Sequence, residues 1–216
     1  AAALTLVENG KAVHFPLVNG TQGVRGMAVS PDGRYLAVAH VLSRYQVPTT
    51  QLDRGWMNTN AVTIMDTACP DRPHPVLLDD PDAGAANPWG VLFSPDGSRL
   101  LVTHAGTHEL SIIDFPALLA RMKKEDRAGN PVSERLGFLH DIRTRVRLPL
   151  NGPRALASDG ENVYVTGYFS DTLAQVPLKA DAVPRNIPLN AEYRPSRERL
   201  GEQYFNLSLI HISEPT

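Results

Sequence analysis

The sequence predicts an all-β chain that forms part of a β-propeller, because one strand-turn-strand unit recurs and a further strand follows each copy. The units are GMAVSPDGRYLAVAH (Gly26 to His40), GVLFSPDGSRLLVTH (Gly90 to His104) and, more loosely, ALASDGENVYVTG (Ala155 to Gly167). Their turn glycines are 64 and 63 residues apart, and self-similarity at a regular period is typical of repeat architectures. Three similar small sheets in series indicate propeller blades.

Each repeat is centred on a tight turn. Proline presets φ at the second turn position, aspartate is tolerated at the third, and glycine relieves the fourth, which explains the recurring Ser-Pro-Asp-Gly. The flanking residues alternate or run apolar, as in Met27, Val29, Tyr35, Leu92 and Val102. This pattern is typical of buried strands, so each turn is expected to join two antiparallel strands.

Further strands complete the blades. NAVTIMD (Asn60 to Asp66), ELSIID (Glu109 to Asp114) and TLAQVP (Thr172 to Pro177) supply the next strand of each repeat, and RLGFLHDIRTRVRLPL (Arg135 to Leu150) supplies an outer strand. The opening segment, Ala1 to Gly20, has the pattern of a hairpin that closes a preceding blade. The sequence thus predicts about three and a half four-stranded antiparallel blades.

One helix is expected after the second blade's third strand, in FPALLARMKKEDRAGN (Phe115 to Asn130). Asp114 is suited to cap it, Pro116 to its first turn, and Gly129 to its end. The apolar residues expected to face the blade are Leu118, Leu119 and Met122.

Composition excludes several classes of function. The 216 residues carry a formal charge of −2, and no basic run exceeds Lys123-Lys124, so the chain lacks the electrostatic footprint of a nucleic-acid binder. No stretch is long and apolar enough to span a membrane. The single cysteine, Cys69, excludes an internal disulfide or a Cys-x-x-Cys motif within these residues.

The repeats resemble those of YVTN-type β-propellers, over roughly residues 22 to 180. The resemblance rests on the SPDG turn, the strand ending VTH or VTG, and the next strand closing on Asp66 or Asp114. It implies a seven-bladed propeller, of which residues 1–180 are a fragment, and a periplasmic or extracellular location. Because the family is broad, the resemblance is more specific for fold than for function.

The segment PSRERLGEQYFN (Pro195 to Asn206) resembles the start of a cytochrome c domain found in a subgroup of these propellers. The match includes Arg199, Gly201 and Phe205, whereas the subgroup's Cys-x-x-Cys-His motif does not occur within this sequence. The resemblance implies that residues 181–206 are a connector and the start of such a domain. Haem c is accordingly implied for the full-length protein, and none is expected within this fragment.

The last ten residues, LSLIHISEPT (Leu207 to Thr216), resemble the translation of a sequencing adapter and are excluded from the fold. The chain is therefore expected to be truncated. Its expected partners are the missing blades and the cytochrome-c-like domain of the same chain, together with a redox partner.

Two histidines are candidate site residues because His40 and His104 both stand seven residues after a turn glycine. Equivalent positions in adjacent blades are expected to point toward the same region of the axial channel. There the imidazoles could share a metal, bind an anion, or line a surface for substrate or a partner domain. Alternatively, each simply ends its strand and bonds a backbone carbonyl. No Glu or Asp stands beside either histidine, which disfavours a metal.

The other candidates lie on the rim that receives the loops entering each blade, where the first repeat carries its insertion, Val41 to Thr59. The residues predicted to bind a substrate or partner are His40, Arg54, Trp56, Asn58, His104, His108 and Tyr168. No phosphate loop or nucleophile elbow is present, so no catalytic residue is assigned.

Two functions remain open from the sequence. The first is the propeller module of an extracytoplasmic c-type haem redox protein, for electron transfer or peroxidase-like chemistry, with the propeller binding substrate or docking the haem domain. The second is a non-enzymatic scaffold propeller of the surface-layer type, which binds a ligand or a protein. Fold alone does not separate them.

Overall fold

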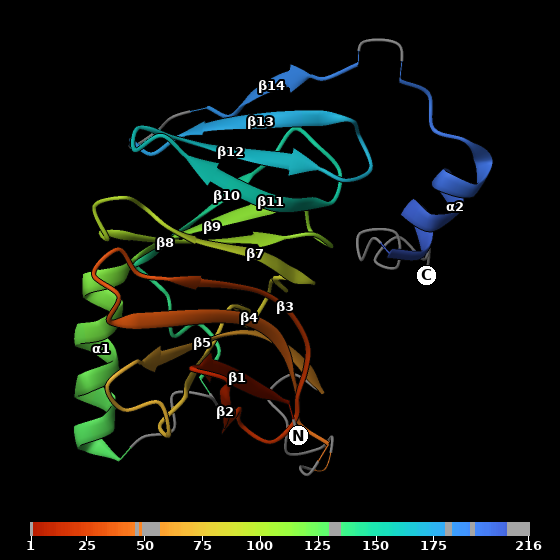
Figure 1. The fold of residues 1–216 in the computed structure, drawn as a ribbon. Helices are drawn as coiled ribbons and strands as arrows, with labels where there is room; N and C mark the ends of the chain where they lie inside the picture. The colour runs from red at the N-terminus through yellow and green to blue at the C-terminus, as the bar shows by residue number, and fades with distance from the viewer. Residues whose placement is uncertain are drawn as a thin grey trace.

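The computed structural model describes residues 2–45, 48, 57–129, 135–179, 183–190 and 193–206. Three four-stranded antiparallel sheets follow one another along the chain, and a two-stranded hairpin precedes them. Figure 1 shows the sheets side by side in chain order, and the first strands of neighbouring sheets are in contact. This architecture is a partial β-propeller and confirms the predicted all-β class.

Each sheet is a blade whose strands pair in sequence order. Blade one contains β3 (Thr21–Val29), β4 (Tyr35–Ser43), β5 (Asn58–Asp66) and β6 (His74–Leu77). Blade two contains β7 (Pro88–Phe93), β8 (Arg99–His104), β9 (Glu109–Asp114) and β10 (Arg143–Arg147). Blade three contains β11 (Pro153–Ser158), β12 (Asn162–Gly167), β13 (Thr172–Pro177) and β14 (Arg185–Pro188).

The blades pack face to face through the apolar residues of their strands. Ile64 of blade one and Phe93 of blade two belong to one buried cluster, and Leu101 of blade two joins Val163 and Val165 of blade three in another. Burying a side chain of this size stabilises the fold by about 1.5–3 kcal/mol. The interfaces between blades are therefore the hydrophobic core.

The inner strands approach each other at two glycines. A Cβ atom on Gly26 would lie 2.1 Å from the backbone oxygen of Trp89, and one on Gly90 would lie 2.1 Å from that of Arg154. Thr103 bridges the second approach, since its hydroxyl accepts a hydrogen bond from the Gly90 amide at 2.8 Å and donates to the Arg154 oxygen at 3.0 Å. Only glycine permits this spacing between neighbouring inner strands.

The Ser-Pro-Asp-Gly turns form as predicted. Gly33 and Gly97 have φ of 72° and 70°, in the left-handed region that glycine adopts at no steric cost. In the second turn the Ser94 hydroxyl donates to Asp96 at 2.5 Å, and Asp96 also accepts from the Ser98 amide at 3.0 Å. These hydrogen bonds, the one from Ser94 foremost, lower the pKa of Asp96 to about 2.

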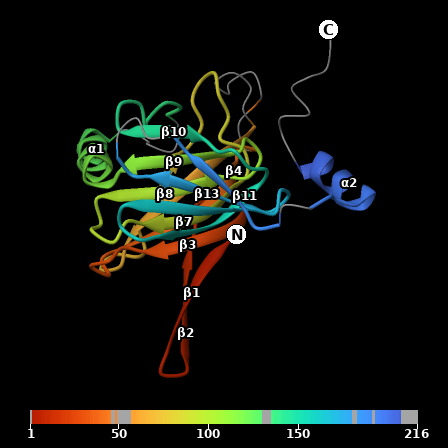
Figure 2. The ribbon, with the colours of Figure 1, turned by 90° about the horizontal axis from the view of Figure 1, so that it is seen from above.

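The N-terminal hairpin consists of β1 (Ala3–Glu8) and β2 (Lys11–Pro16). Figure 2 shows its tip projecting away from the blades. Its base packs against Val38 and Met65 on the free face of blade one. On the inner strand of that face, Met27 and Val29 are 65% and 56% exposed.

Helix α1 (Phe115–Ala128) forms where the sequence predicts it. The Asp114 carboxylate accepts from the Ala117 amide at 2.9 Å, and Gly129 ends the helix with φ of 70°. Leu118 and Met122 are buried against the blades, and Leu119 packs beside them. None of the helices within the described ranges is long and apolar enough to cross a membrane.

The C-terminal part differs from the sequence interpretation in one respect. Strand β14 pairs with β13, so blade three continues to Pro188, within the segment that was expected to be a connector. Four residues are too short for a clear periodic pattern, and an edge strand tolerates its terminal proline. Helix α2 (Arg197–Asn206) follows, and residues 207–216 lie outside the described part of the chain.

Candidate functional site

The two aligned histidines lie inside their blades. His40 and His104 are both 0% exposed. The Nδ1 atom of His40 lies 3.1 Å from the Val41 oxygen and its Nε2 lies 2.7 Å from the Thr63 hydroxyl. In His104, Nδ1 lies 3.1 Å from the Ala85 oxygen and Nε2 lies 2.7 Å from the Ser111 hydroxyl.

These contacts define the protonation of both rings. A carbonyl oxygen only accepts, so Nδ1 must donate and Nε2 must accept from the hydroxyl. Burial, with a smaller contribution from Arg145 and Arg143, lowers the pKa of His104 to about 3; burial also lowers the pKa of His40. Neither ring therefore has a free lone pair for a metal, and neither side chain is exposed in the described part of the chain.

The third blade lacks this hydrogen-bonded pair altogether. Gly167 occupies the histidine position, opposite Thr172, and Ala174 occupies the position of Thr63 and Ser111. The histidine and its hydroxyl partner are lost together, which indicates that they act as one structural unit across two strands. The binding role predicted for His40 and His104 stays a prediction. In the structure, both side chains are fully buried.

The remaining predicted residues are distributed along the rim. Arg54 and Trp56 lie outside the described residues. Asn58 begins β5 and accepts a long hydrogen bond from Gln22 at 3.4 Å. His108 is 6% exposed, and its Nδ1 accepts from the Gly152 amide at 3.0 Å. Burial, aided by the charge of Arg147, lowers the pKa of His108 to about 4, so it is a neutral structural group at this rim.

Tyr168 is a predicted site residue that the structure brings into a cluster of arginine and aromatic side chains. It follows β12 and is 38% exposed. The Cζ atom of Arg154 lies 3.2 Å from its ring centroid, and that of Arg199 lies 4.0 Å from the same centroid. The tyrosine is therefore in contact with one arginine of the propeller and with one of helix α2.

Register shifts position the rest of this cluster. The pairing of each inner strand with its neighbour is interrupted near the rim, between Gln22 and Gly26, between Pro88 and Val91, and between Pro153 and Leu156. Such bulges re-aim side chains out of a regular ladder. The displaced residues include Arg25, Trp89 and Arg154, which lie in equivalent positions of the three blades.

These side chains stack in alternation. The Cζ atoms of Arg25 and Arg154 lie 4.0 and 3.9 Å from the Trp89 ring centroid. We call Arg25, Trp89, Arg154, Tyr168 and Arg199 the arginine-aromatic ladder. Each stacked cation contributes about 0.5–2 kcal/mol, with the higher value where water is excluded. The ladder connects all three blades and α2 at the elaborated rim.

A set of polar contacts fastens α2 to the end of the ladder. The Tyr168 hydroxyl donates to Glu202 Oε1 at 3.1 Å, and Arg199 donates to Glu202 Oε2 at 2.5 Å. Arg199 also donates to the Tyr168 backbone oxygen. The hydrogen bond from Arg199, foremost, lowers the pKa of Glu202. We refer to Tyr168, Arg199 and Glu202 as the helix clasp.

Sequence reasoning identified the rim and Tyr168 but missed the ladder. The sequence places the loops entering each blade at this rim, but it does not assign Arg25, Trp89 or Arg154 to a site. Arg25, Trp89 and Arg154 immediately precede Gly26, Gly90 and Ala155, which are equivalent positions of the three inner strands. This common position in the repeat was the available sequence signal. The stacking itself depends on the bulges, which leave no pattern of their own in the sequence.

Candidate metal-ligating side chains are not gathered into one cluster in the described part of the chain. No group of three or more His, Cys, Asp or Glu side chains among them could hold a metal ion. Cys69 is exposed, and both ring nitrogens of His40 and His104 are engaged.

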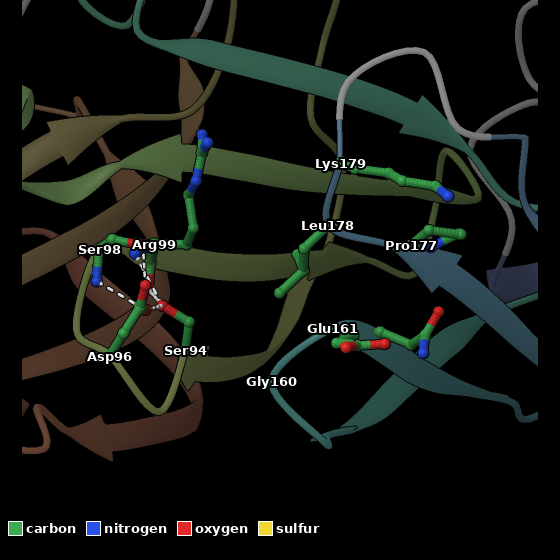
Figure 3. A pocket seen from close by; sticks show the side chains of 10 residues that line it. Ser94, Asp96, Ser98, Arg99, Gly160, Glu161, Pro177, Leu178 and Lys179 are labelled. Atoms are coloured by element: carbon green, nitrogen blue, oxygen red, sulfur yellow. Dashed lines mark hydrogen bonds between the residues drawn. The ribbon is translucent and has the colours of Figure 1, made fainter.

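A cavity of 570 Å³ lies at the opposite end of the inner strands, between the turns of blades two and three. Figure 3 shows Ser94, Asp96 and Ser98 on one wall and Glu161, Leu178 and Lys179 on the other. Both Asp96 carboxylate oxygens already accept hydrogen bonds within their turn. The carboxylate of Asp96 is therefore already engaged within its own turn.

Fold and rim together define a propeller module with a stacked, cationic surface at one end. No family model matches the chain. Its sequence is 26% identical over 179 residues to hydrazine synthase subunit beta of Kuenenia stuttgartiensis, a match that covers 81% of this chain. The chain is homologous to that subunit, and the match spans 46% of the subunit's length.

Solved structures agree on the fold. The Kuenenia stuttgartiensis hydrazine synthase matches with a TM-score of 0.68 at 23% identity, covering 83% of this chain and 56% of that one. Virginiamycin B lyase from Staphylococcus aureus matches with a TM-score of 0.55 at 13% identity, covering 88% and 50%. The periplasmic gluconolactonase of Pseudomonas aeruginosa matches with a TM-score of 0.54 at 16% identity, covering 89% and 50%. At these identities the likeness concerns the propeller fold.

Proposed function

We propose that this chain is the propeller module of an extracytoplasmic c-type haem redox protein with YVTN-type repeats, and that its ladder rim docks the haem domain. The observation that carries the proposal is the helix clasp. The first helix after blade three does not extend away from the propeller; it is held on the elaborated rim by Tyr168, Arg199 and Glu202. A domain that continues from α2 would thereby start at this rim.

Homology supports the assembly part of the proposal. The relative is named as the beta subunit of hydrazine synthase, so it works as one part of a multisubunit enzyme. We extend this to the present chain as a module that positions other parts and leaves the chemistry to them. In such an arrangement the cofactor performs electron transfer, while the propeller supplies orientation and electrostatics.

The free face of blade one supports the same interpretation. Met27 and Val29 are exposed there, whereas Phe93, at the position equivalent to Val29 in β7, is buried against blade one. Apolar side chains of an inner strand are normally covered by a neighbouring blade. We propose that further blades of a closed propeller cover them.

The haem part is tested with the product of the complete gene. Expressed in a host that matures c-type cytochromes, the protein is expected to carry covalently bound haem, read from the absorbance of the reduced protein after denaturation. A soluble product without haem would overturn the redox proposal. It would leave the alternative, a non-enzymatic scaffold propeller that binds a ligand or a protein at the same rim.

A further inference from the structure

The ladder leaves hydrogen-bond donors free at its propeller end. The guanidinium groups of Arg25 and Arg154 both lie over the Trp89 ring, with their Cζ atoms 4.0 and 3.9 Å from its centroid. Stacking uses the faces only, whereas the N–H donors of a guanidinium lie in its plane. The Nε atom of Arg154 is buried and has no hydrogen-bond partner.

The two arginines at this end also repel each other electrostatically. Burial lowers the pKa of Arg25, and the neighbouring charge of Arg154 lowers it further. The charge of Arg154 also contributes to lowering the pKa of Glu202, whose two carboxylate oxygens accept hydrogen bonds from Tyr168 and Arg199. Two like charges are thus held against one indole ring, although their mutual repulsion opposes this arrangement.

We infer that Arg25 and Arg154 form a binding site for the oxyanion group of a small ligand, of the carboxylate or phosphate class. The fork of a guanidinium matches both groups with paired hydrogen bonds. Stacking on Trp89 and Tyr168 fixes the forks before the ligand arrives, which reduces the entropy lost on binding. An oxyanion would satisfy the buried donor and offset the repulsion. The inference requires only blades one to three and does not depend on the haem proposal.

Trp89 provides the reporter for a test on the intact chain. The chain has two tryptophans, so protein labelled with fluorotryptophan gives two fluorine resonances, and Trp56→Phe identifies the one that belongs to Trp89. We would titrate inorganic phosphate and, separately, acetate at constant ionic strength maintained with sodium chloride. Constant ionic strength separates site binding from general screening. The expected result is a saturable shift of the Trp89 resonance with at least one of the two anions.

Variants of Arg25 and Arg154 test whether the shift of the Trp89 resonance depends on their guanidinium groups. Arg25→Gln and Arg154→Gln are each expected to weaken the apparent affinity by about tenfold or more, the usual effect of losing a hydrogen bond to a charged group. Arg25→Lys keeps the charge but loses the fork, and it is expected to weaken binding as well. Arg34→Gln is the matched control, because Arg34 lies at the opposite end of blade one beside Asp66 and its loss should leave the titration unchanged.

Arg25 is exposed, so its variants are expected to fold even if Arg154→Gln does not. A response to phosphate alone or acetate alone assigns the ligand class and supports the site. A resonance that does not saturate, or that shifts equally in wild-type protein and Arg25→Gln, overturns it.

Discussion

At the residue scale, the recurring His40 and His104 are buried, and both ring nitrogens of each lie within hydrogen-bond distance of partners in the chain. They became candidate site residues because they occupy the same position in two blades. The same repetition arises, however, when two blades use the same side-chain hydrogen bonds to join a pair of strands. The partner of Nε2 distinguishes a strand-joining role from a ligand-binding role. It is the Thr63 hydroxyl for His40 and the Ser111 hydroxyl for His104, each on the adjacent strand. That partner lies two positions beyond the directly paired residue, so only the register of the strands reveals it.

His104 should make folding stability depend on pH. Its pKa is about 3 in the folded chain, against an ordinary value of 6.5. Below pH 6.5 the unfolded chain therefore binds a proton that the folded chain does not, and the free energy of unfolding falls by about 1.4 kcal/mol per pH unit as pH drops toward 3. Above pH 6.5 the effect vanishes.

The variant His104→Gln isolates this effect, because glutamine can retain both hydrogen bonds but does not titrate. Urea unfolding at a series of pH values should give a shallower pH dependence for the variant than for wild-type protein in the acidic range. Equal slopes would contradict a buried, neutral His104.

At the element scale, the packing of the inner strands depends on glycine. Gly90→Ala is expected to lower the free energy of unfolding by about 1–3 kcal/mol, the usual cost of overpacking, because the new Cβ would lie 2.1 Å from the Arg154 oxygen. The matched control is Ala155→Ser, at the equivalent but exposed position of β11. Chemical unfolding of both variants checks this; a loss as large in the control would remove the steric explanation.

The helix clasp makes a second prediction at this scale. A helix of ten residues such as α2 is marginal in isolation, and none of its residues is buried. Tyr168→Ala or Arg199→Ala should therefore speed hydrogen exchange of the α2 amides while leaving the blade amides unchanged. Tyr164→Ala is the control, since the Tyr164 hydroxyl donates to Asp159 in the turn that precedes β12, whereas Tyr168 follows the other end of that strand. Unchanged exchange in the clasp variants would mean that α2 is held in another way.

At the scale of the whole molecule, the sequence predicted the propeller well and its site less well. Turns, apolar alternation and the α1 caps are local signals, and the structure confirms them at Gly33, Gly97 and Asp114. The ladder arises from bulges in three strands that are far apart in the chain, so no local pattern contains it. Arg54 and Trp56, two of the predicted rim residues, lie outside the described part, and their role stays a prediction.

If the ladder rim docks another domain, the Trp89 ring must be shielded from water in the complete protein. The Trp89 fluorine resonance would be recorded in ordinary and in heavy water, for the present chain and for the product of the complete gene. The solvent isotope shift reports contact of the indole with water. We expect this shift in the present chain, its loss in the complete protein, and its return there when Tyr168→Ala and Arg199→Ala are combined. The same isotope shift in both proteins would contradict the rim as a docking surface.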